Sequence, residues 1–172
     1  KAISHKKKIE LAYRLKLDGK ASPIRRTHIP KPGKSERRPL GIPTIDDRAK
    51  QMLVKLALEP EWEAIFEPNS YGFRPGRSCH DATATLFLSL RGKSRYVLDA
   101  DIQKCFDRID HDKLLKKLST FDLMENQIKA WLKVDIIVGY LNRPDEVIQA
   151  MEGTPQGGVI SPLLANIALH GL

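Results

Sequence analysis

Residues 96–102 alternate apolar and polar side chains in the order YVLDADI, which is the pattern of a β-strand that buries one face. Leu98 and Ala100 would lie on one face, and Asp99 and Asp101 on the other, so that two carboxylates point the same way. On both sides of this segment apolar residues recur at spacings of three and four, which predicts helices. A strand set among helices predicts an α+β fold.

Apolar spacing, capping residues and terminating glycine or proline predict the remaining elements. Helices are expected over residues 3–17, from Asp46 to the interruption at Pro60, from Ser78 to Gly92, over 112–118 and 124–137, and from the N-cap Ser161 with Pro162 at the first helical position. Residues 23–43, rich in Pro, Gly, Lys and Arg, predict a hairpin with a charged tip. Residues 139–152 predict a second hairpin or a loop insertion.

The chain has 172 residues, of which 41% are hydrophobic, enough for one sizeable core and too few for two domains. No apolar run has the length that a membrane span needs, and the N-terminal residues lack the apolar stretch of a signal peptide. We therefore expect no membrane partner and an intracellular, cytoplasmic location. Cys79 and Cys105 fit neither a disulfide framework nor a metal motif and are expected to fill the core.

Positive charge is concentrated at the N-terminal end. Residues 1–50 contain fifteen Lys or Arg against five Asp or Glu, a balance of +10, so the remaining 122 residues carry −2 of the total charge of +8. A segment this basic favours a polyanionic partner, because Lys and Arg neutralise phosphates. We accordingly predict that Arg25 and Arg26 contact nucleic acid. A basic tail that only keeps the chain in solution is the alternative.

Asp101 is the candidate metal ligand. A carboxylate at the end of a strand flanked by apolar residues can present oxygen to a hard cation such as Mg²⁺. An aspartate on an edge strand that faces solvent beside Asp99 has the same local sequence. The pattern alone leaves both interpretations open.

Three blocks together resemble one family. They are HIPKPGKSERRPLGIPTIDDRAKQ at 28–51, SYGFRPGRSCHDA at 70–82 followed by VLDADIQKCFDRIDH at 97–111, and GTPQGGVISPLLANIALHGL at 153–172. In this order and spacing they resemble the N-terminal blocks of group II intron-encoded reverse transcriptases, also called maturases. Related reverse transcriptases of CRISPR-associated and other retroelements share parts of the pattern, and they stay as an alternative.

The resemblance implies roles for individual residues. Asp101 matches the first metal-binding aspartate of the palm, with the backbone carbonyl of Ile102 also facing the metal, and Phe106 matches the aromatic gate beneath the sugar of the incoming nucleotide. Gln156, followed by Gly157, matches the loop that packs against the nascent base pair, where glycine lets backbone approach a nucleotide. The positions that match the triphosphate-binding residues of the fingers are Lys31, Lys34, Arg37 and Arg38.

The SYGFRPGRS block mixes cations and aromatic rings. Arg74 and Arg77 beside Tyr71 and Phe73 suit phosphate contact and stacking under a template strand. For Phe73 we favour a ring that plugs the core. His111 follows Asp110 near a helix start and is expected to cap or pack.

The second set of catalytic carboxylates in this family stands in a Tyr-x-Asp-Asp hairpin, which this sequence does not contain. The resemblance therefore implies a right-hand polymerase piece, with fingers over residues 1–95 and the start of the palm over 96–172. The complete protein would be an RNA-directed DNA polymerase that uses two Mg²⁺ ions, and the piece alone is expected to be inactive. Its partners would be group II intron RNA, whose splicing and retromobility it would assist, an RNA template with a DNA primer, and deoxynucleoside triphosphates. A non-catalytic RNA-binding module is the rival function.

Overall fold

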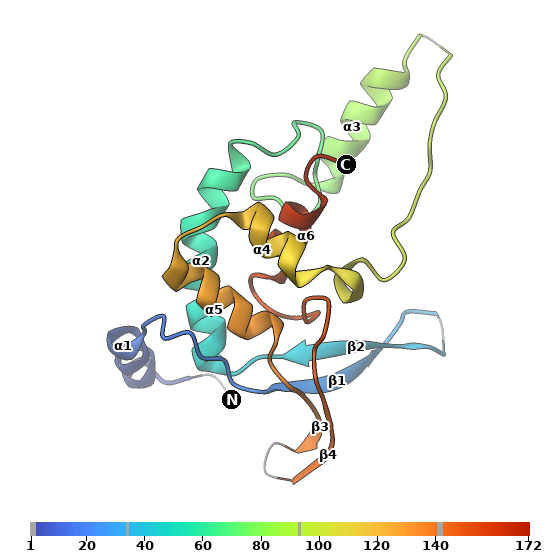
Figure 1. The fold of residues 1–172 in the computed structure, drawn as a ribbon. Helices are drawn as coiled ribbons and strands as arrows, with labels where there is room; N and C mark the ends of the chain where they lie inside the picture. Colours follow the sequence, from blue (N-terminus) through green and yellow to red (C-terminus); the bar gives the residue numbers. More distant parts are fainter. Residues whose placement is uncertain (1–2, 34, 93, 141–142) are drawn as a thin grey trace.

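The structure is a computed structural model that describes residues 3–33, 35–92, 94–140 and 143–172 (Figure 1). In chain order the elements of these residues are α1 (His5–Arg14), β1 (Ile24–Pro30), β2 (Arg37–Ile42), α2 (Ile45–Glu63), α3 (Cys79–Leu90), the 3₁₀-helix η1 (Cys105–Arg108), α4 (His111–Leu118), α5 (Asp122–Leu132), β3 (Ile136–Tyr140), β4 (Arg143–Ile148) and α6 (Ser161–Leu169). Helices and one sheet occupy separate parts of the molecule, which confirms the α+β class. None of the described helices has the length and apolarity needed to cross a membrane.

The sheet has the strand order β2-β1-β3-β4. β1 and β2 form the predicted basic hairpin, in which Arg26 pairs with Gly41 and Pro30 with Arg37. β3 lies parallel to β1 with Ile24 opposite Ile136, and β4 returns antiparallel to β3, so the second predicted region is a hairpin. The helix expected over 124–137 ends five residues early, at Leu132, because its last residues join the sheet.

Four helices, α2, α4, α5 and α6, enclose the core and lie together above the sheet in Figure 1. In α2, α5 and α6 the most deeply buried side chains of this cluster are aliphatic: Val54, Leu58, Ile128, Leu132, Leu164 and Ile167. The buried leucines of α4 complete the core. The inward positions predicted for α4 and α5 are confirmed, since Leu114, Leu118 and Trp131 are buried. The apolar spacing of these helices thus places the sheet and the loops around one core.

Both predicted ends of α2 are wrong by a few residues. Thr44, not Asp46, is the N-cap, and its hydroxyl accepts the N–H of Asp47 at 3.2 Å. The helix continues through Pro60 to Glu63. A proline costs the helix one backbone hydrogen bond, and Leu58 and Trp62, buried on either side of it, hold the last turn against the core.

Two buried polar side chains fasten the N-terminal segment to the helices. Asp47 accepts the backbone N–H of Ser22 at 3.0 Å and the indole N–H of Trp131 at 3.1 Å. Gln127 accepts the N–H of Asp18 at 3.1 Å and donates to the carbonyl of Lys20 at 2.8 Å. Because these groups are satisfied, they hold the start of β1 in place at little cost of burial.

Residues 79–92 and 94–104, which together we call the arm, project from the helices and return along an extended segment (Figure 1). Ser78 and Asp81 form the predicted capping box of α3, but no residue of this helix is buried. The strand predicted over 96–102 is absent from this structure: these residues have no regular secondary structure and are exposed. A strand must pair its backbone N–H and C=O groups with a neighbouring strand, and the sheet of this structure lies elsewhere. Cys79, expected in the core, is exposed on the arm.

Candidate functional site

The loop of residues 153–158 lies between the hairpin and η1 and is bonded to both. Its Thr154 N–H donates to the carbonyl of Phe106 at 2.7 Å, and its Gln156 carbonyl accepts the N–H of Gly41 in β2, also at 2.7 Å. Gly157 has φ +118°, and a Cβ at this position would stand 2.5 Å from the carbonyl oxygen of Gly41. The glycine therefore allows a contact of backbone with backbone.

Buried polar side chains of α2 and α6 also form hydrogen bonds with this loop and with the residue that follows it. The Ser161 hydroxyl donates to the carbonyl of Pro155 at 2.9 Å, and the Thr154 hydroxyl donates to Ser161, also at 2.9 Å. Gln51 of α2 accepts the N–H of Val159 at 2.7 Å. The prediction that Ser161 caps α6 is wrong, since the cap position belongs to Ile160 and the serine hydroxyl is engaged by the loop.

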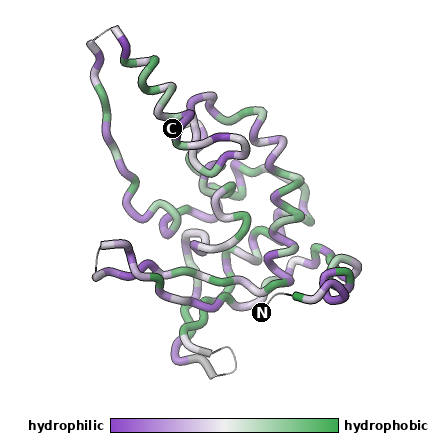
Figure 2. Tube along the Cα trace, turned by 180° about the vertical axis from the view of Figure 1, so that it is seen from behind, coloured by the Kyte–Doolittle hydropathy of each residue, from purple (hydrophilic) through white to green (hydrophobic). Residues whose placement is uncertain are grey.

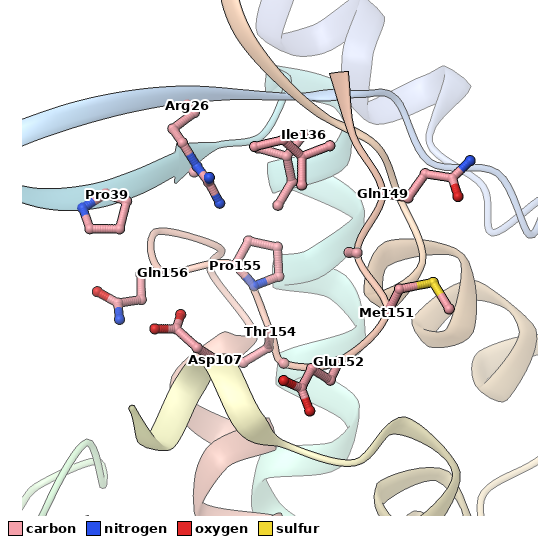
Figure 3. Close-up of a pocket in the computed structure, with 14 residues that line it drawn as sticks. Arg26, Pro39, Asp107, Ile136, Gln149, Met151, Glu152, Thr154, Pro155 and Gln156 are labelled. Carbon is pink, nitrogen blue, oxygen red and sulfur yellow. The ribbon is translucent and has the colours of Figure 1, made fainter. Parts of the chain in front are cut away.

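A cavity of about 300 Å³ opens where the hairpin, η1 and the loop meet. Figure 3 shows Arg26 reaching into it from β1, with Asp107 and Gln156 on the opposite wall and Glu152 below them. The cavity brings together one cation, two carboxylates and the amides of Gln149 and Gln156. Of the predicted site residues, Arg26 and Gln156 line the cavity. Phe106 directly precedes Asp107, which also lines it.

The remaining predicted cations of the hairpin lie outside the cavity. Arg25, Arg37 and Arg38 are exposed on β1 and β2. Lys31 Nζ forms an ion pair with Glu36 at 2.5 Å across the turn, and this hydrogen bond lowers the pKa of the Glu36 carboxyl. Lys34 lies outside the described residues. The described hairpin thus presents three exposed guanidinium groups beside one cation that already has a carboxylate partner.

Asp101 and Ile102 are exposed on the extended part of the arm. Burial, and secondarily the carboxylate of Asp101, raise the pKa of the Cys105 thiol. Among the residues that the structure describes, no three His, Cys, Asp or Glu side chains gather as a metal site. The candidate ligand Asp101 is therefore not part of a cluster of three or more such side chains in the described part of the chain.

The prediction that Arg74 contacts nucleic acid is corrected by the structure. Its side chain is only 2% exposed and forms an ion pair with Glu63 at 2.7 Å. A further donor reaches the Glu67 carbonyl at 2.8 Å, and the guanidinium lies 5.1 Å from the Phe66 ring centroid. A guanidinium committed in this way fixes the loop before α3 and has no donor free for a phosphate.

Arg77 and Phe73 differ from Arg74 in burial. Arg77 is half-buried, donates to the carbonyls of Pro68 and Ser70, and lies over the Tyr71 ring at 5.5 Å. Phe73, expected to plug the core, is 65% exposed and meets Phe106 edge to face. His111 is buried, and its Nε2 lies 2.6 Å from the Gly153 carbonyl, so the predicted packing role is confirmed.

Several residues of the site were not predicted from the sequence. Gln51 supports the loop through Val159, which lies more than a hundred residues further along the chain. Thr154 supports it through Phe106, which lies about fifty residues earlier. Asp107 follows the predicted gate Phe106 directly, so its neighbourhood could have suggested it. Glu152 precedes the glycine-rich motif without any pattern of its own.

The chain was compared with known proteins. The family model described as Reverse transcriptase (RNA-dependent DNA polymerase) matches residues 29–172. The group II intron-encoded protein LtrA of Lactococcus lactis subsp. cremoris is 44% identical over 153 residues, which are 87% of this chain and 24% of that protein. Protein YkfC of Escherichia coli K12 is 41% identical over 86% of this chain and 39% of its own length. Nuclear intron maturase 1, mitochondrial, of Arabidopsis thaliana is 30% identical over 51% of this chain and 13% of its own length.

The chain therefore belongs to the reverse transcriptase family. Within that family, the resemblance to group II intron-encoded proteins that the three motif blocks predicted is confirmed by these relatives. The chain spans about a quarter of the length of the lactococcal protein.

Proposed function

We propose that this chain supplies the fingers, residues 1–95, and the start of the palm, residues 96–172, of a group II intron reverse transcriptase. The full-length protein would add deoxynucleotides to a DNA primer on an RNA template, and would bind the intron RNA that it helps to splice and to move. The observation that carries this proposal is the cavity lined by Arg26, Asp107 and Gln156, of which Asp107 directly follows Phe106 in η1.

The hairpin would provide the positive charge for this reaction. Arg37 and Arg38 are exposed on β2, and with Lys31 and Lys34 they would hold the triphosphate, since guanidinium and ammonium groups neutralise the leaving pyrophosphate. Arg25 and Arg26 on the neighbouring strand would contact the nucleic acid backbone. Lys31 would exchange Glu36 for a phosphate oxygen, because an exposed ion pair is worth about 1 kcal/mol or less.

The loop and η1 would define the position of the new base pair. Gln156 and Gly157 would lie against it, and Arg77 would help to hold the template strand. Phe106 would stand beneath the sugar and exclude a 2′-hydroxyl. The bonds from Gly41 and Thr154 fix the loop between sheet and helix, and a fixed loop is what selection by shape requires.

Two Mg²⁺ ions would supply the charge neutralisation that this chemistry needs. Asp101 and the carbonyl of Ile102 do not by themselves fit such a pair of ions, because each ion takes about six oxygen ligands and no further acidic cluster gathers among the described residues. We propose that they form one part of a site completed elsewhere in the full-length protein.

A non-catalytic RNA-binding module is the second candidate, favoured by the charge of +10 in residues 1–50. Asp101→Ala in the full-length protein separates the two. The polymerase proposal expects loss of primer extension on an RNA template with unchanged RNA affinity, whereas Asp122→Ala, which removes an exposed carboxylate at the start of α5, should leave extension intact. Extension that survives Asp101→Ala would remove Asp101 from the catalytic site.

A further inference from the structure

Phe73 has an unusual backbone and an unusual position for a phenylalanine. Its φ of 59° lies in the left-handed region, which bulky residues other than glycine rarely adopt. Its side chain is 65% exposed, so burial in the core does not account for it. Residues held in such conformations cluster at functional sites, where the surrounding structure imposes them.

The loop around Phe73 is held rigidly on both sides of it. On one side, Asn166 of α6 donates from its side-chain amide to the carbonyl of Gly72 at 2.9 Å. On the other, Arg74 is buried and bonded to Glu63 at 2.7 Å. Residue 73 therefore stands between two anchored neighbours, and its direction is set by the fold.

The ring of Phe73 is directed at Phe106. The two ring centroids lie 6.0 Å apart with an angle of 84° between the planes, the edge-to-face arrangement that aromatic pairs prefer. The backbone of Phe106 is fixed separately, by the bond from the Thr154 N–H to its carbonyl. The Phe106 side chain packs against the core cluster, and the Phe73 ring adds a contact that restricts its rotation further.

We infer that Phe73 is a positioning residue for Phe106, and that it thereby sets how strongly the protein excludes nucleotides with a 2′-hydroxyl. This inference rests on the proposed role of Phe106 as the sugar gate. A gate excludes a hydroxyl only while its ring stays in place, since a ring that can rotate away leaves room for the extra oxygen. Phe73 acts through the ring of Phe106 and does not itself touch the sugar.

The test measures kcat/KM for ribonucleotide and for deoxynucleotide addition by the full-length protein and its Phe73→Asn, Phe73→Tyr and Phe106→Ala variants. Asparagine tolerates the left-handed backbone, so Phe73→Asn removes the ring without adding strain. We expect Phe73→Asn to raise the relative use of ribonucleotides about two- to tenfold, the effect of one aromatic pair. Phe73→Tyr, which keeps the ring, should retain the selectivity of the original protein.

The matched control is Phe121→Ala, which removes another exposed phenylalanine, 58% exposed, at the N-cap of α5 and outside the arm. It should leave the ratio of ribonucleotide to deoxynucleotide addition unchanged. In the Phe106→Ala background, Phe73→Asn should cause no further change, because a residue that acts through Phe106 has nothing left to position.

Three results would overturn the inference. If Phe106→Ala alters sugar selectivity and Phe73→Asn does not, Phe106 is the gate and Phe73 plays no part. If the two effects add in the double variant, Phe73 acts on the substrate independently. If Phe106→Ala leaves selectivity unchanged, the gate itself is misassigned and the positioning role falls with it.

Discussion

Gly157 is the residue at which the loop and the hairpin come closest. Its φ of +118° is unfavourable for any side chain, and a Cβ there would stand 2.5 Å from the backbone oxygen of Gly41. A backbone atom in a sheet cannot move aside without disturbing the strand. The contact between sheet and loop, and with it one wall of the cavity, therefore depends on the absence of a side chain at this position.

Gly157→Ala should lower the free energy of unfolding by about 1–3 kcal/mol from overpacking, in addition to the cost of the backbone conformation. Gly76→Ala is the matched control, because Gly76 also has a positive φ, +66°, but a Cβ there would meet nothing within 4 Å. Urea denaturation of both variants measures the difference. Equal losses would show that the loop does not pack against Gly41 as closely as the structure has it.

Glu67 links the end of α2 to the C-terminal end of the described chain. Bonds from its own N–H, from the N–H of Gly171 at 2.7 Å and from the His170 ring lower the pKa of its carboxyl from 4.5 to about 2. Because the folded state lowers this pKa, the charged group stabilises the fold fully above about pH 4.5, and the contribution is lost as the pH falls towards 2.

Glu67→Gln should therefore have a lower melting temperature than the original protein near neutral pH, and the difference should shrink as the pH falls below about 4.5. Melting both proteins between about pH 7 and pH 2.5 measures this. Glu61→Gln, an exposed glutamate within α2, controls for the loss of one negative charge. A difference in melting temperature that stays constant with pH would contradict the account of Glu67.

At the scale of elements, the β1–β2 hairpin carries the charge that distinguishes the N-terminal part of the chain. Two of its arginines lie on each strand, and all of them except Arg26, which lines the cavity, are exposed. Such a surface favours binding of a phosphate backbone, whose neutralisation releases counterions.

Replacement of Arg25, Arg26, Lys31 and Lys34 by glutamine should weaken RNA binding and flatten the slope of log affinity against log salt by roughly 0.7 to 0.9 for each lost contact. The control replaces four exposed lysines of α4 and α5, and of the residue after α5, by glutamine: Lys113, Lys116, Lys129 and Lys133. Both variants lose the same charge, so net charge cannot explain a difference. An equal slope in the two variants would show that the hairpin does not contact the RNA.

The basic hairpin and most helices that the sequence predicted are present, including α1 and α3, which have no buried residue. The hairpin of residues 23–43 and the inward faces of α4 and α5 are confirmed, because turn residues and apolar spacing reflect burial that the structure realises. The alternation over 96–102 predicted a strand with one buried face, but these residues are exposed and no described strand pairs with them. Alternation of apolar and polar residues thus predicts a strand only where a neighbouring strand is present to pair with it.

Part of the site was also predictable, because some of its residues stand in local sequence motifs. Phe106 and Gln156 stand in local sequence motifs. The segments that contain them lie side by side in the structure because the Thr154 N–H donates a hydrogen bond to the Phe106 carbonyl. Arg74 was misassigned because an arginine in a turn has the same sequence signature whether it meets a phosphate or, as here, a buried Glu63. Only the packing of α2 against the loop distinguishes the two.

At the scale of the whole molecule, the chain brings sheet, loop and 3₁₀-helix to one cavity, while Asp101 lies exposed on the arm and outside that cavity. Figure 2 shows hydrophobic segments alternating with hydrophilic ones along this arm. Exposed apolar residues there, among them Leu88 and Leu98, are typical of a surface that another segment covers. We expect the arm and its carboxylate to reach their working arrangement only in a longer protein.

The most direct test is primer extension on an RNA template with Mg²⁺ by residues 1–172 alone and by the full-length protein. We expect no incorporation by the 172-residue chain, which should still fold and bind RNA, because the described residues gather no set of ligands for two metal ions. Synthesis should appear in the full-length protein and disappear with Asp101→Ala. Nucleotide incorporation by the 172-residue chain that is lost with Asp101→Ala would contradict the claim that it holds only part of the active site.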